Sequence, residues 1–306
     1  MNDELTAELS RIAPVRRDEP MSRHVTFGVG GPADLFVSVK NEEQLREAFV
    51  TGKRHGVPVY IFGSGSNVLV GDGGIRGLVI DNQHAELGEP WENGVGPRVS
   101  AGSGLSFATL ARRLANDGYS GVEWACGIPG SLGGAVVTNA GAYGRSLRDV
   151  LINARLTNAE GKVSEFSAAD LELDYRKSAL ATGTIVESAV LSVDVRLQRS
   201  DAEVLKETIR RFDEQRKSAQ PTGQNCGSVF KNPPDKAAWE YVDGAGLRGH
   251  RIGNAQFSEL HSNFILNLGG ATARDITSLI ELAQERIREQ TGVEMTPEVA
   301  FVGEFE

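Results

Sequence analysis

Apolar residues recur at helical spacing in several segments of the chain, most clearly over residues 272–290. They fall three or four positions apart there, which is the pattern of a helix with one buried face. Thr272 is a suitable N-cap for this helix, and Gly292 is a suitable end. The same spacing predicts helices over residues 42–53, 107–114 and 201–217, with Asn41 and Ser106 as caps of the first two.

Short apolar runs bounded by turn-forming residues predict the strands. These runs cover residues 35–39, 57–62, 77–80, 98–101, 151–157, 162–166, 184–197 and 263–267. Strand and helix alternate over residues 35–80, which indicates a small α/β subdomain, and the polar stretch 81–96 is the expected connection to the next part. We therefore expect an α+β fold in three parts, residues 1–85, 86–200 and 201–306.

The composition is typical of a folded chain without membrane spans. Of the 306 residues 40% are hydrophobic, and no apolar run reaches the roughly 18 residues of a bilayer-spanning helix. A net charge of −9 argues against a protein that coats nucleic acid. Cys126 and Cys226 form no CxxC motif, which favours reduced thiols. Acidic residues precede the first basic one, unlike the order in a signal peptide, so we expect a cytoplasmic protein.

Glycine is concentrated in two places, with six between Gly63 and Gly77 and eight between Gly118 and Gly144. Both runs lie between expected strands or helices, where glycine indicates a sharp turn or a close approach to the backbone. Residues 63–67 (Gly-Ser-Gly-Ser-Asn) directly follow a strand, so their N–H groups are placed to hold an anion such as a pyrophosphate, although a plain tight turn is the alternative. The second run is able to lie flat against a planar ligand or to pack as a helix and loop.

Two further segments combine residues that carry chemistry. Residues 174–178 (Asp-Tyr-Arg-Lys-Ser) place a cation beside an aromatic ring, with a surface charge cluster as the alternative. Residues 227–233 (Gly-Ser-Val-Phe-Lys-Asn-Pro) hold a hydroxyl, an amine and an amide in one loop. The chain has no Walker A motif, no G-x-S-x-G elbow and no His or Cys spacing of a metal site, and Gly28-Val-Gly30 is followed by a strand rather than the helix of a Rossmann fold. We expect no metal.

Together these segments resemble the UDP-N-acetylenolpyruvoylglucosamine reductase (MurB) family, in the order and over nearly the whole length of the chain. The matching segments are residues 26–31, 63–69, 127–144, 175–178, 227–233, 258–264 and 297–299. The compact length is similar to that of the shorter subtype of the family. The resemblance implies an FAD-binding region of two subdomains, of the PCMH or vanillyl-alcohol oxidase type, followed by a C-terminal α+β substrate-binding domain.

The resemblance also implies a reaction. NADPH is the expected hydride donor, and UDP-N-acetylenolpyruvoylglucosamine is the substrate, which becomes UDP-N-acetylmuramate for peptidoglycan synthesis. Neither histidine nor cysteine occurs in residues 57–80, so we expect FAD to be bound noncovalently. No nucleic acid, membrane or obligate protein partner is expected.

Three residues match the catalytic positions of the family. The resemblance implies that Arg176 meets the substrate carboxylate, that Ser228 donates a proton, and that Glu298 either donates a hydrogen bond or orients Arg176. The expected FAD contacts are Gly63, Ser64, Gly65, Ser66, Asn67, Ile128, Pro129, Ser131, Gly133, Gly134 and Asn139. The expected substrate contacts are Tyr175, Lys231, Asn232 and His261, and core packing is the alternative for Tyr175 and His261.

Two other functions compete with this interpretation. One is a related FAD-dependent oxidoreductase that acts on a different small molecule. The other is a non-catalytic protein that binds a flavin or a nucleotide sugar. The serine loop at Ser228 and the carboxylate of Glu298 favour the reductase over the first of these, and the second stays open.

Overall fold

The structure is a computed structural model that describes residues 3–92 and 94–305. The α-helices are α1 (Asp3–Ile12), α2 (Glu42–Arg54), α3 (Phe107–Asn116), α4 (Leu132–Thr138), α5 (Ala202–Ala219), α6 (Ala238–Gly244) and α7 (Ala273–Thr291). The strands are β1 (Val15–Pro20), β2 (Pro32–Val39), β3 (Val59–Phe62), β4 (Val68–Val70), β5 (Ile75–Asn82), β6 (Trp91–Glu92), β7 (Pro97–Gly102), β8 (Tyr119–Ser120), β9 (Gly141–Ala142), β10 (Arg145–Ser146), β11 (Leu151–Asn158), β12 (Val163–Phe166), β13 (Ser188–Arg196), β14 (Gln198–Arg199), β15 (Arg251–Ile252), β16 (Ala255–Phe257), β17 (Ile265–Asn267) and β18 (Ala300–Val302). Short 3₁₀ turns occupy Met21–Arg23, Glu123–Ala125 and Leu147–Asp149.

The chain forms two compact units, each assembled from separate segments. The first unit contains Met1–Arg16, Leu35–Ser64 and Gly77–Arg216, and the second contains Arg17–Asp34, Gly65–Arg76 and Lys217–Glu306. The chain therefore passes between the units several times. The expected division into three parts at residues 85 and 200 stays a prediction.

The larger sheet of the first unit is antiparallel, with the strand order β12-β11-β13-β7-β6. The alternating apolar residues of β11 and β13 pack with α3 and α4 in one core. Within this core the rings of Phe107 and Trp124 meet edge to face, with their centroids 5.3 Å apart. Ser106 caps α3 as expected, since its side chain accepts a hydrogen bond from Thr109 N. The strand expected over 184–197 begins only at Ser188.

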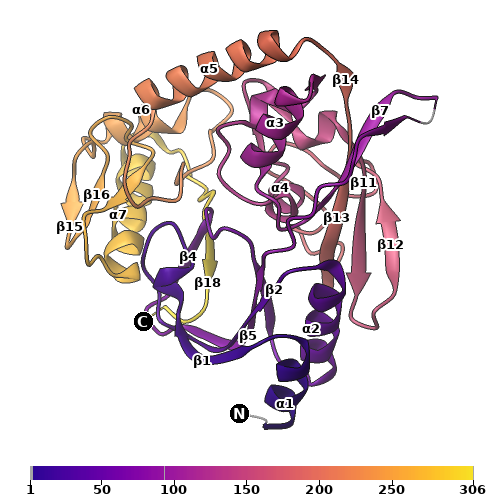
Figure 1. Ribbon diagram of the computed structural model, residues 1–306. Helices are drawn as coiled ribbons and strands as arrows, with labels where there is room; N and C mark the ends of the chain where they lie inside the picture. The colour runs from indigo at the N-terminus through magenta and orange to yellow at the C-terminus, as the bar shows by residue number, and fades with distance from the viewer. Residues whose placement is uncertain (1–2, 93, 306) are drawn as a thin grey trace. The chain divides into compact units, whose positions relative to one another are not determined.

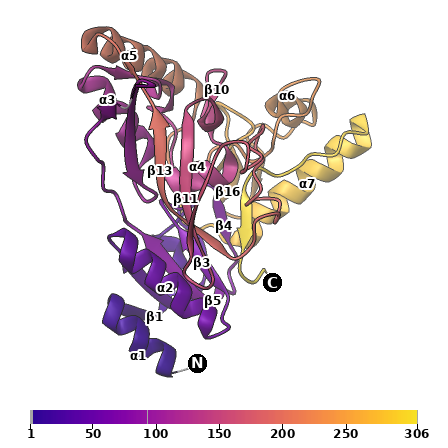
Figure 2. The ribbon, with the colours of Figure 1, turned by 90° about the vertical axis from the view of Figure 1, so that its right-hand side faces the viewer.

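The remaining part of the first unit has the expected alternation of strand and helix. Strands β3 and β5 pair in parallel within a sheet of order β1-β2-β5-β3. Helix α2 begins at the expected cap Asn41, whose side chain accepts a hydrogen bond from Gln44 N. Its buried face packs with Leu5 and Leu9 of α1 in a second core, and Figure 2 shows the two helices side by side. Helix α1 is not among the helices that the apolar pattern predicts.

The second unit combines helices α6 and α7 with the small antiparallel sheet β15-β16-β17. Helix α7 lies along β16 and β15 (Figure 1) and buries the predicted stripe of isoleucine, leucine and alanine. Thr272 caps this helix, and Gly292 ends it with a φ of 74°, both as predicted. Strand β18 pairs in parallel with β4, so residues 300–302 lie beside residues 68–70.

Several regions contain more secondary structure than the apolar pattern predicts. The stretch 81–96 includes β6, and residue 93 of that stretch lies outside the described residues. The glycine-rich run 118–144 forms α4 and the loops around it, with Leu132, Ala135 and Val136 buried. Within the described ranges, no helix combines the length and apolar character needed to cross a lipid bilayer.

Candidate active site

The first glycine loop exposes backbone N–H groups immediately after β3. In the described part of the chain, no protein group accepts a hydrogen bond from the N–H groups of Ser64, Gly65 or Ser66. Gly65 has a φ of +59°, and a Cβ there would lie 2.2 Å from the carbonyl oxygen of His24. A side chain therefore does not fit at this position. Such a set of unpaired donors is suited to the oxygens of a phosphate or pyrophosphate.

Asn67, at the end of this loop, is bonded to the C-terminal segment. Its side-chain Nδ2 donates a hydrogen bond to the backbone oxygen of Glu298 at 3.1 Å. Its own carbonyl accepts from Ala300 N at 3.0 Å, which continues the pairing of β18 with β4. The loop residue expected to contact FAD thus holds the backbone on both sides of Val299.

Ser228 and Glu298 are brought together by backbone pairing within the second unit. Glu298 N donates to the carbonyl of Val229 at 2.7 Å, and Lys231 N donates to the carbonyl of Thr296 at 2.9 Å. Burial raises the pKa of the Cys226 thiol, and the charge of Glu298 raises this pKa further. The Glu298 carboxylate is therefore close to a residue two positions before Ser228. A hydroxyl and a carboxylate on paired segments are suited to holding a substrate and transferring a proton.

The second glycine run packs against the start of the first loop. A Cβ at Gly63 would lie 2.1 Å from the Oγ of Ser131, so only glycine allows the two loops to approach this closely. Ser131 also caps α4 by accepting a hydrogen bond from Gly134 N at 3.4 Å. Pro129 and Gly134 are exposed, while Ile128 and Gly133 are half-buried. These loop residues, predicted to contact FAD, thus lie on one part of the first unit together with Gly63.

Arg176 lies at the tip of a tight turn. Asp174 and Lys177 bond each other through both pairs of backbone N–H and carbonyl groups at 3.1 Å, which leaves Tyr175 and Arg176 between them. Arg176 has a φ of 49°, an uncommon conformation for a residue with a side chain. Ser178 is buried and donates to the carbonyl of Val137 at 2.6 Å, which fixes the turn to α4. The side chain of Tyr175 is 60% exposed, so the alternative that it packs in the core is excluded.

The remaining predicted substrate contacts belong to the second unit. The Asn232 side chain accepts a hydrogen bond from Ala238 N at 2.9 Å, at the start of α6. His261 Nδ1 accepts from Asn263 N at 3.3 Å, so in the neutral ring the proton is on Nε2. Burial lowers the pKa of His261, and the nearby charge of Arg248 also lowers it, which favours that neutral form. His261 is thus a hydrogen-bond donor rather than a cation at neutral pH.

The predicted site residues are distributed over both units. The first unit contains Gly63, Ser64, Ile128, Pro129, Ser131, Gly133, Gly134, Asn139, Tyr175 and Arg176. The second contains Gly65, Ser66, Asn67, Ser228, Lys231, Asn232, His261 and Glu298. The sequence reasoning missed the roles of Ser178, whose side chain bonds the turn of Arg176 to α4, and of Asn263, whose side chain bonds Phe230 two residues after Ser228. Both residues stand in the matching segments, which was the available signal.

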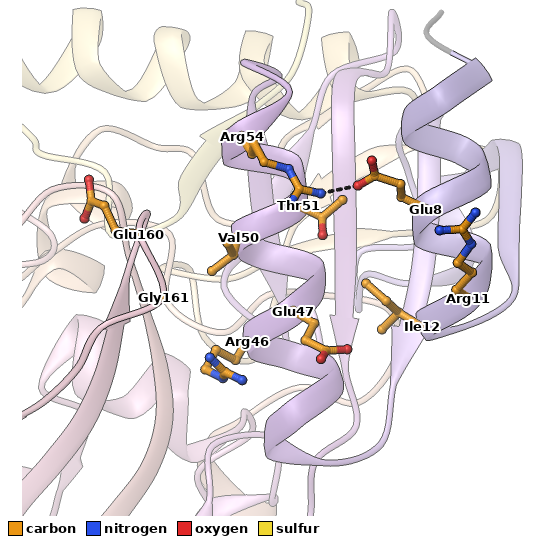
Figure 3. Close-up of a pocket in the computed structure, with 10 residues that line it drawn as sticks. All are labelled: Glu8, Arg11, Ile12, Arg46, Glu47, Val50, Thr51, Arg54, Glu160 and Gly161. Carbon is orange, nitrogen blue, oxygen red and sulfur yellow. Dashed lines mark hydrogen bonds and ion pairs between the residues drawn. The ribbon is translucent and has the colours of Figure 1, made fainter.

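A metal-binding cluster and an open pocket are the other kinds of site that a chain of this composition could contain. Across residues 3–92 and 94–305, no group of three or more His, Cys, Asp or Glu side chains is arranged to hold a metal ion. An open pocket of about 510 Å³ lies between α1, α2 and the turn at Glu160–Gly161 (Figure 3). Its rim contains arginine and glutamate side chains of balanced charge, including the ion pair of Glu8 with Arg54. None of the predicted site residues lines this pocket.

Comparison with known proteins shows which proteins this chain is similar to. Residues 33–167 match the model of an FAD binding domain, and residues 218–302 match that of the C-terminal domain of UDP-N-acetylenolpyruvoylglucosamine reductase. A reductase of this name from Rubrobacter xylanophilus is 41% identical over 97% of this chain and 98% of its own length, and one from Lachnoclostridium phytofermentans is 37% identical over 99% of both. The crystal structure of the Thermus caldophilus reductase superposes with a TM-score of 0.78 at 31% identity, over 95% of this chain and 100% of that one.

The fold and the site define a flavin-dependent oxidoreductase, in which an FAD-binding domain is followed by a separate C-terminal domain. The chain belongs to the UDP-N-acetylenolpyruvoylglucosamine reductase family, as the resemblance implied.

Proposed function

We propose that this chain reduces the enolpyruvyl group of UDP-N-acetylenolpyruvoylglucosamine to give UDP-N-acetylmuramate, with NADPH as the electron source. The observation that carries the proposal is the pairing of the Ser228 segment with Glu298 in a member of this family. Both cysteines are free, which supports a location in a reducing compartment such as the cytoplasm. The partners that we propose are the small-molecule substrates alone.

The unpaired N–H groups of Ser64, Gly65 and Ser66 fit the pyrophosphate of FAD. The further proposed FAD contacts are Gly63, Asn67, Ile128, Pro129, Ser131, Gly133, Gly134 and Asn139. A bound FAD would supply the hydride-transfer chemistry between NADPH and the β-carbon of the substrate. No histidine or cysteine lies in residues 57–80, so the binding is noncovalent.

Arg176 binds the carboxylate of the substrate. Hydride addition at the β-carbon moves negative charge toward this carboxylate, and a guanidinium binds a carboxylate through two parallel hydrogen bonds. Glu298 assists, either as a protonated donor to the carboxylate or as an ionised group that orients Arg176. Tyr175 is exposed beside Arg176, as a substrate contact requires.

Ser228 donates the proton that the α-carbon must gain. A free hydroxyl is a weak acid, so the alkoxide that it leaves must be stabilised by a neighbouring positive charge or donor. Lys231 follows three positions later and Asn232 four, and His261 supplies a neutral N–H. These three residues are the proposed contacts to the polar groups of the substrate.

The Ser228→Ala variant tests the proposal by separating the two half-reactions. Stopped-flow absorbance should show flavin reduction by NADPH at the wild-type rate and a reoxidation by substrate that is nearly abolished. Ser278→Ala, a serine of α7 outside the site, is the matched control and should retain both rates. Equal loss of both half-reactions in Ser228→Ala would contradict the assigned role.

Arg176→Ala separates a catalytic from a structural role for the arginine. The variant should purify with its full complement of flavin, because no proposed FAD contact is removed. An apoprotein would instead make Arg176 structural. For the wild type, NADPH consumption that requires the enolpyruvyl substrate excludes both a different small-molecule substrate and a non-catalytic binding protein.

A further inference from the structure

The two residues after Ser228 have all their backbone polar groups bonded to two other segments. Val229 N donates to the carbonyl of Asn263 at 2.8 Å, and the Val229 carbonyl accepts from Glu298 N at 2.7 Å. Phe230 N donates to Oδ1 of Asn263 at 2.9 Å, and Nδ2 of Asn263 donates to the Phe230 carbonyl at 2.9 Å. Asn263 thus supplies three of the four hydrogen bonds. Its side chain pairs with the N–H and the carbonyl of Phe230, as the backbone of a neighbouring strand would.

Asn263 is itself held in place. Its side chain is buried, with 3% of the residue exposed, and its N–H donates to Nδ1 of His261 at 3.3 Å. The preceding Ser262 is buried and donates to the carbonyl of Trp239 at 2.9 Å. Ser258 Oγ accepts from the N–H groups of Leu260 and His261 at 3.1 and 3.2 Å. Asn263 is therefore part of a bonded loop that cannot easily follow a movement of residues 229 and 230.

The chain on the other side of Ser228 has no comparable support. Gly227 has a φ of +81°, and a Cβ added there would meet no atom within 4 Å. Its N–H donates to the side chain of Asn225 two residues earlier, which is a local turn. The direction of the Ser228 side chain is therefore set mainly from the side of Val229 and Phe230.

We propose that Asn263 is a positioning residue that fixes Ser228 relative to Glu298. This inference rests on the proposed function, because it assigns Asn263 a role only through the proton donated by Ser228. Val229 pairs with the backbone of both Asn263 and Glu298, and the side-chain amide of Asn263 holds the neighbouring Phe230. Loss of that amide therefore frees one side of the strand that carries the donor. A displacement of about 1 Å at a reacting group is sufficient to cost on the order of 100-fold in rate.

The test compares Asn263→Ala with Asn267→Ala. Asn267 is a buried asparagine of the same unit whose side chain also bonds backbone groups, since Nδ2 donates to Phe27 O at 2.8 Å and Oδ1 accepts from Gly269 N at 2.8 Å. Asn263→Ala should keep the wild-type rate of flavin reduction by NADPH and lose on the order of 100-fold in reoxidation by saturating substrate. Its reoxidation should show a larger solvent deuterium isotope effect, because proton donation becomes slower. Asn267→Ala should retain both rates.

Asn263→Asp serves where the alanine variant does not fold. It keeps the acceptor for Phe230 N and removes the donor to the Phe230 carbonyl, so a smaller loss confined to reoxidation is expected. Hydrogen exchange supplies a readout that is independent of activity. The amide of Phe230 should exchange faster in Asn263→Ala, which lacks its acceptor Oδ1, and at the wild-type rate in Asn267→Ala.

The outcomes separate this inference from the proposed function. A wild-type flavin that the enolpyruvyl substrate does not reoxidise would contradict the proposed function itself, and wild-type reoxidation in Ser228→Ala would contradict the role of Ser228. Slow reoxidation in Ser228→Ala together with wild-type reoxidation in the Asn263 variants would overturn only the role of Asn263. Equal slowing of both half-reactions in the Asn263 variants, or the same slowing in Asn267→Ala, would also overturn it, because it would indicate a general loss of structure.

Discussion

The side-chain amide of Asn139 joins the end of α4 to Asp174, donating from Nδ2 to the Asp174 carbonyl at 2.8 Å. The other side-chain atom, Oδ1, accepts from Arg148 N at 3.0 Å. Both polar atoms of this buried side chain therefore bond the protein backbone. Asp174 is the first residue of the turn that carries Arg176, so Asn139 holds this turn in place. This role is additional to its proposed contact with FAD.

Asn139→Gly removes this support without straining the backbone. Asn139 ends α4 with a φ of 43°, a conformation that glycine adopts freely. The Asp174 carbonyl loses its buried donor, which costs about 1–3 kcal/mol of unfolding free energy. We expect kcat/KM of the flavin-containing enzyme for the enolpyruvyl substrate to fall by roughly tenfold or more, beyond any loss of flavin, as measured by steady-state kinetics normalised to flavin absorbance.

The control for this prediction is Thr138→Ala. Thr138 precedes Asn139 and bonds only the carbonyl of Gly134 in its own helix, at 3.0 Å. Its replacement should leave kcat/KM within about a factor of two, since such surface changes cost little. Loss of flavin from Asn139→Gly, with kcat/KM of the residual holoenzyme unchanged, would show that the side chain serves FAD binding alone.

His84 makes the folded state sensitive to acid. Burial lowers its pKa below the ordinary value, against the charges of Glu42 and Glu86, which raise it. The unfolded chain therefore binds a proton at a higher pH than the folded chain does. As the pH falls through about 6.5, the ordinary histidine pKa, the unfolded state is favoured by up to about 1.4 kcal/mol per pH unit.

His84→Gln should flatten that dependence. Urea unfolding of the wild type between pH 7.5 and pH 5 should show a loss of stability toward acid, and the variant should lose less over the same range. Part of the slope should remain, because the pKa of His261 is also lowered by burial. Parallel curves for the two proteins would contradict the assignment to His84.

Both thiols should be unreactive in the folded protein. Cys126 is 2% exposed and Cys226 is 4% exposed, and burial raises the pKa of each. The thiolate is the reactive form, so both burial and the raised pKa oppose alkylation. Iodoacetamide at pH 8 should label neither cysteine of the native protein and both in denaturant, as counted by mass spectrometry. Rapid labelling of the native protein would show that its buried segments open readily.

The helices with a clear apolar stripe were predictable, and those without one were not. Helix α7 has buried apolar residues on each turn, a threonine cap and a glycine end, so its position follows from local chemistry. Helix α4 is only seven residues long and has no polar face, and α1 buries only Leu5 and Leu9. Neither pattern is distinct from that of a loop when the packing partner is unknown.

The contacts that orient the site residues lie beyond local pattern. Asn67 bonds a residue 231 positions away, and Asn263 bonds one 33 positions away. No periodicity connects such segments, because their proximity is a consequence of the fold. The family resemblance supplies the proposed site residues, which stay a prediction, whereas the asparagines that hold the neighbouring backbone follow only from the three-dimensional structure. The same holds for the second unit, which unites residues 17–34 and 65–76 with the C-terminal part of the chain.

Asp72 provides the last prediction, which concerns stability rather than catalysis. Its carboxylate accepts hydrogen bonds from Ala273 N at 2.9 Å and Arg274 N at 3.1 Å, at the start of α7. A negative charge at this position satisfies unpaired N–H groups and complements the helix dipole. Asp72→Ala should therefore lower the unfolding free energy by about 1–2 kcal/mol, measured by urea denaturation. Glu281→Ala, on the exposed face of the same helix, should change it by less than about 0.5 kcal/mol. Because Asp72 bonds the helix and not the Ser228 segment, both half-reactions should persist in the variant, and a selective loss of reoxidation would contradict this structural role.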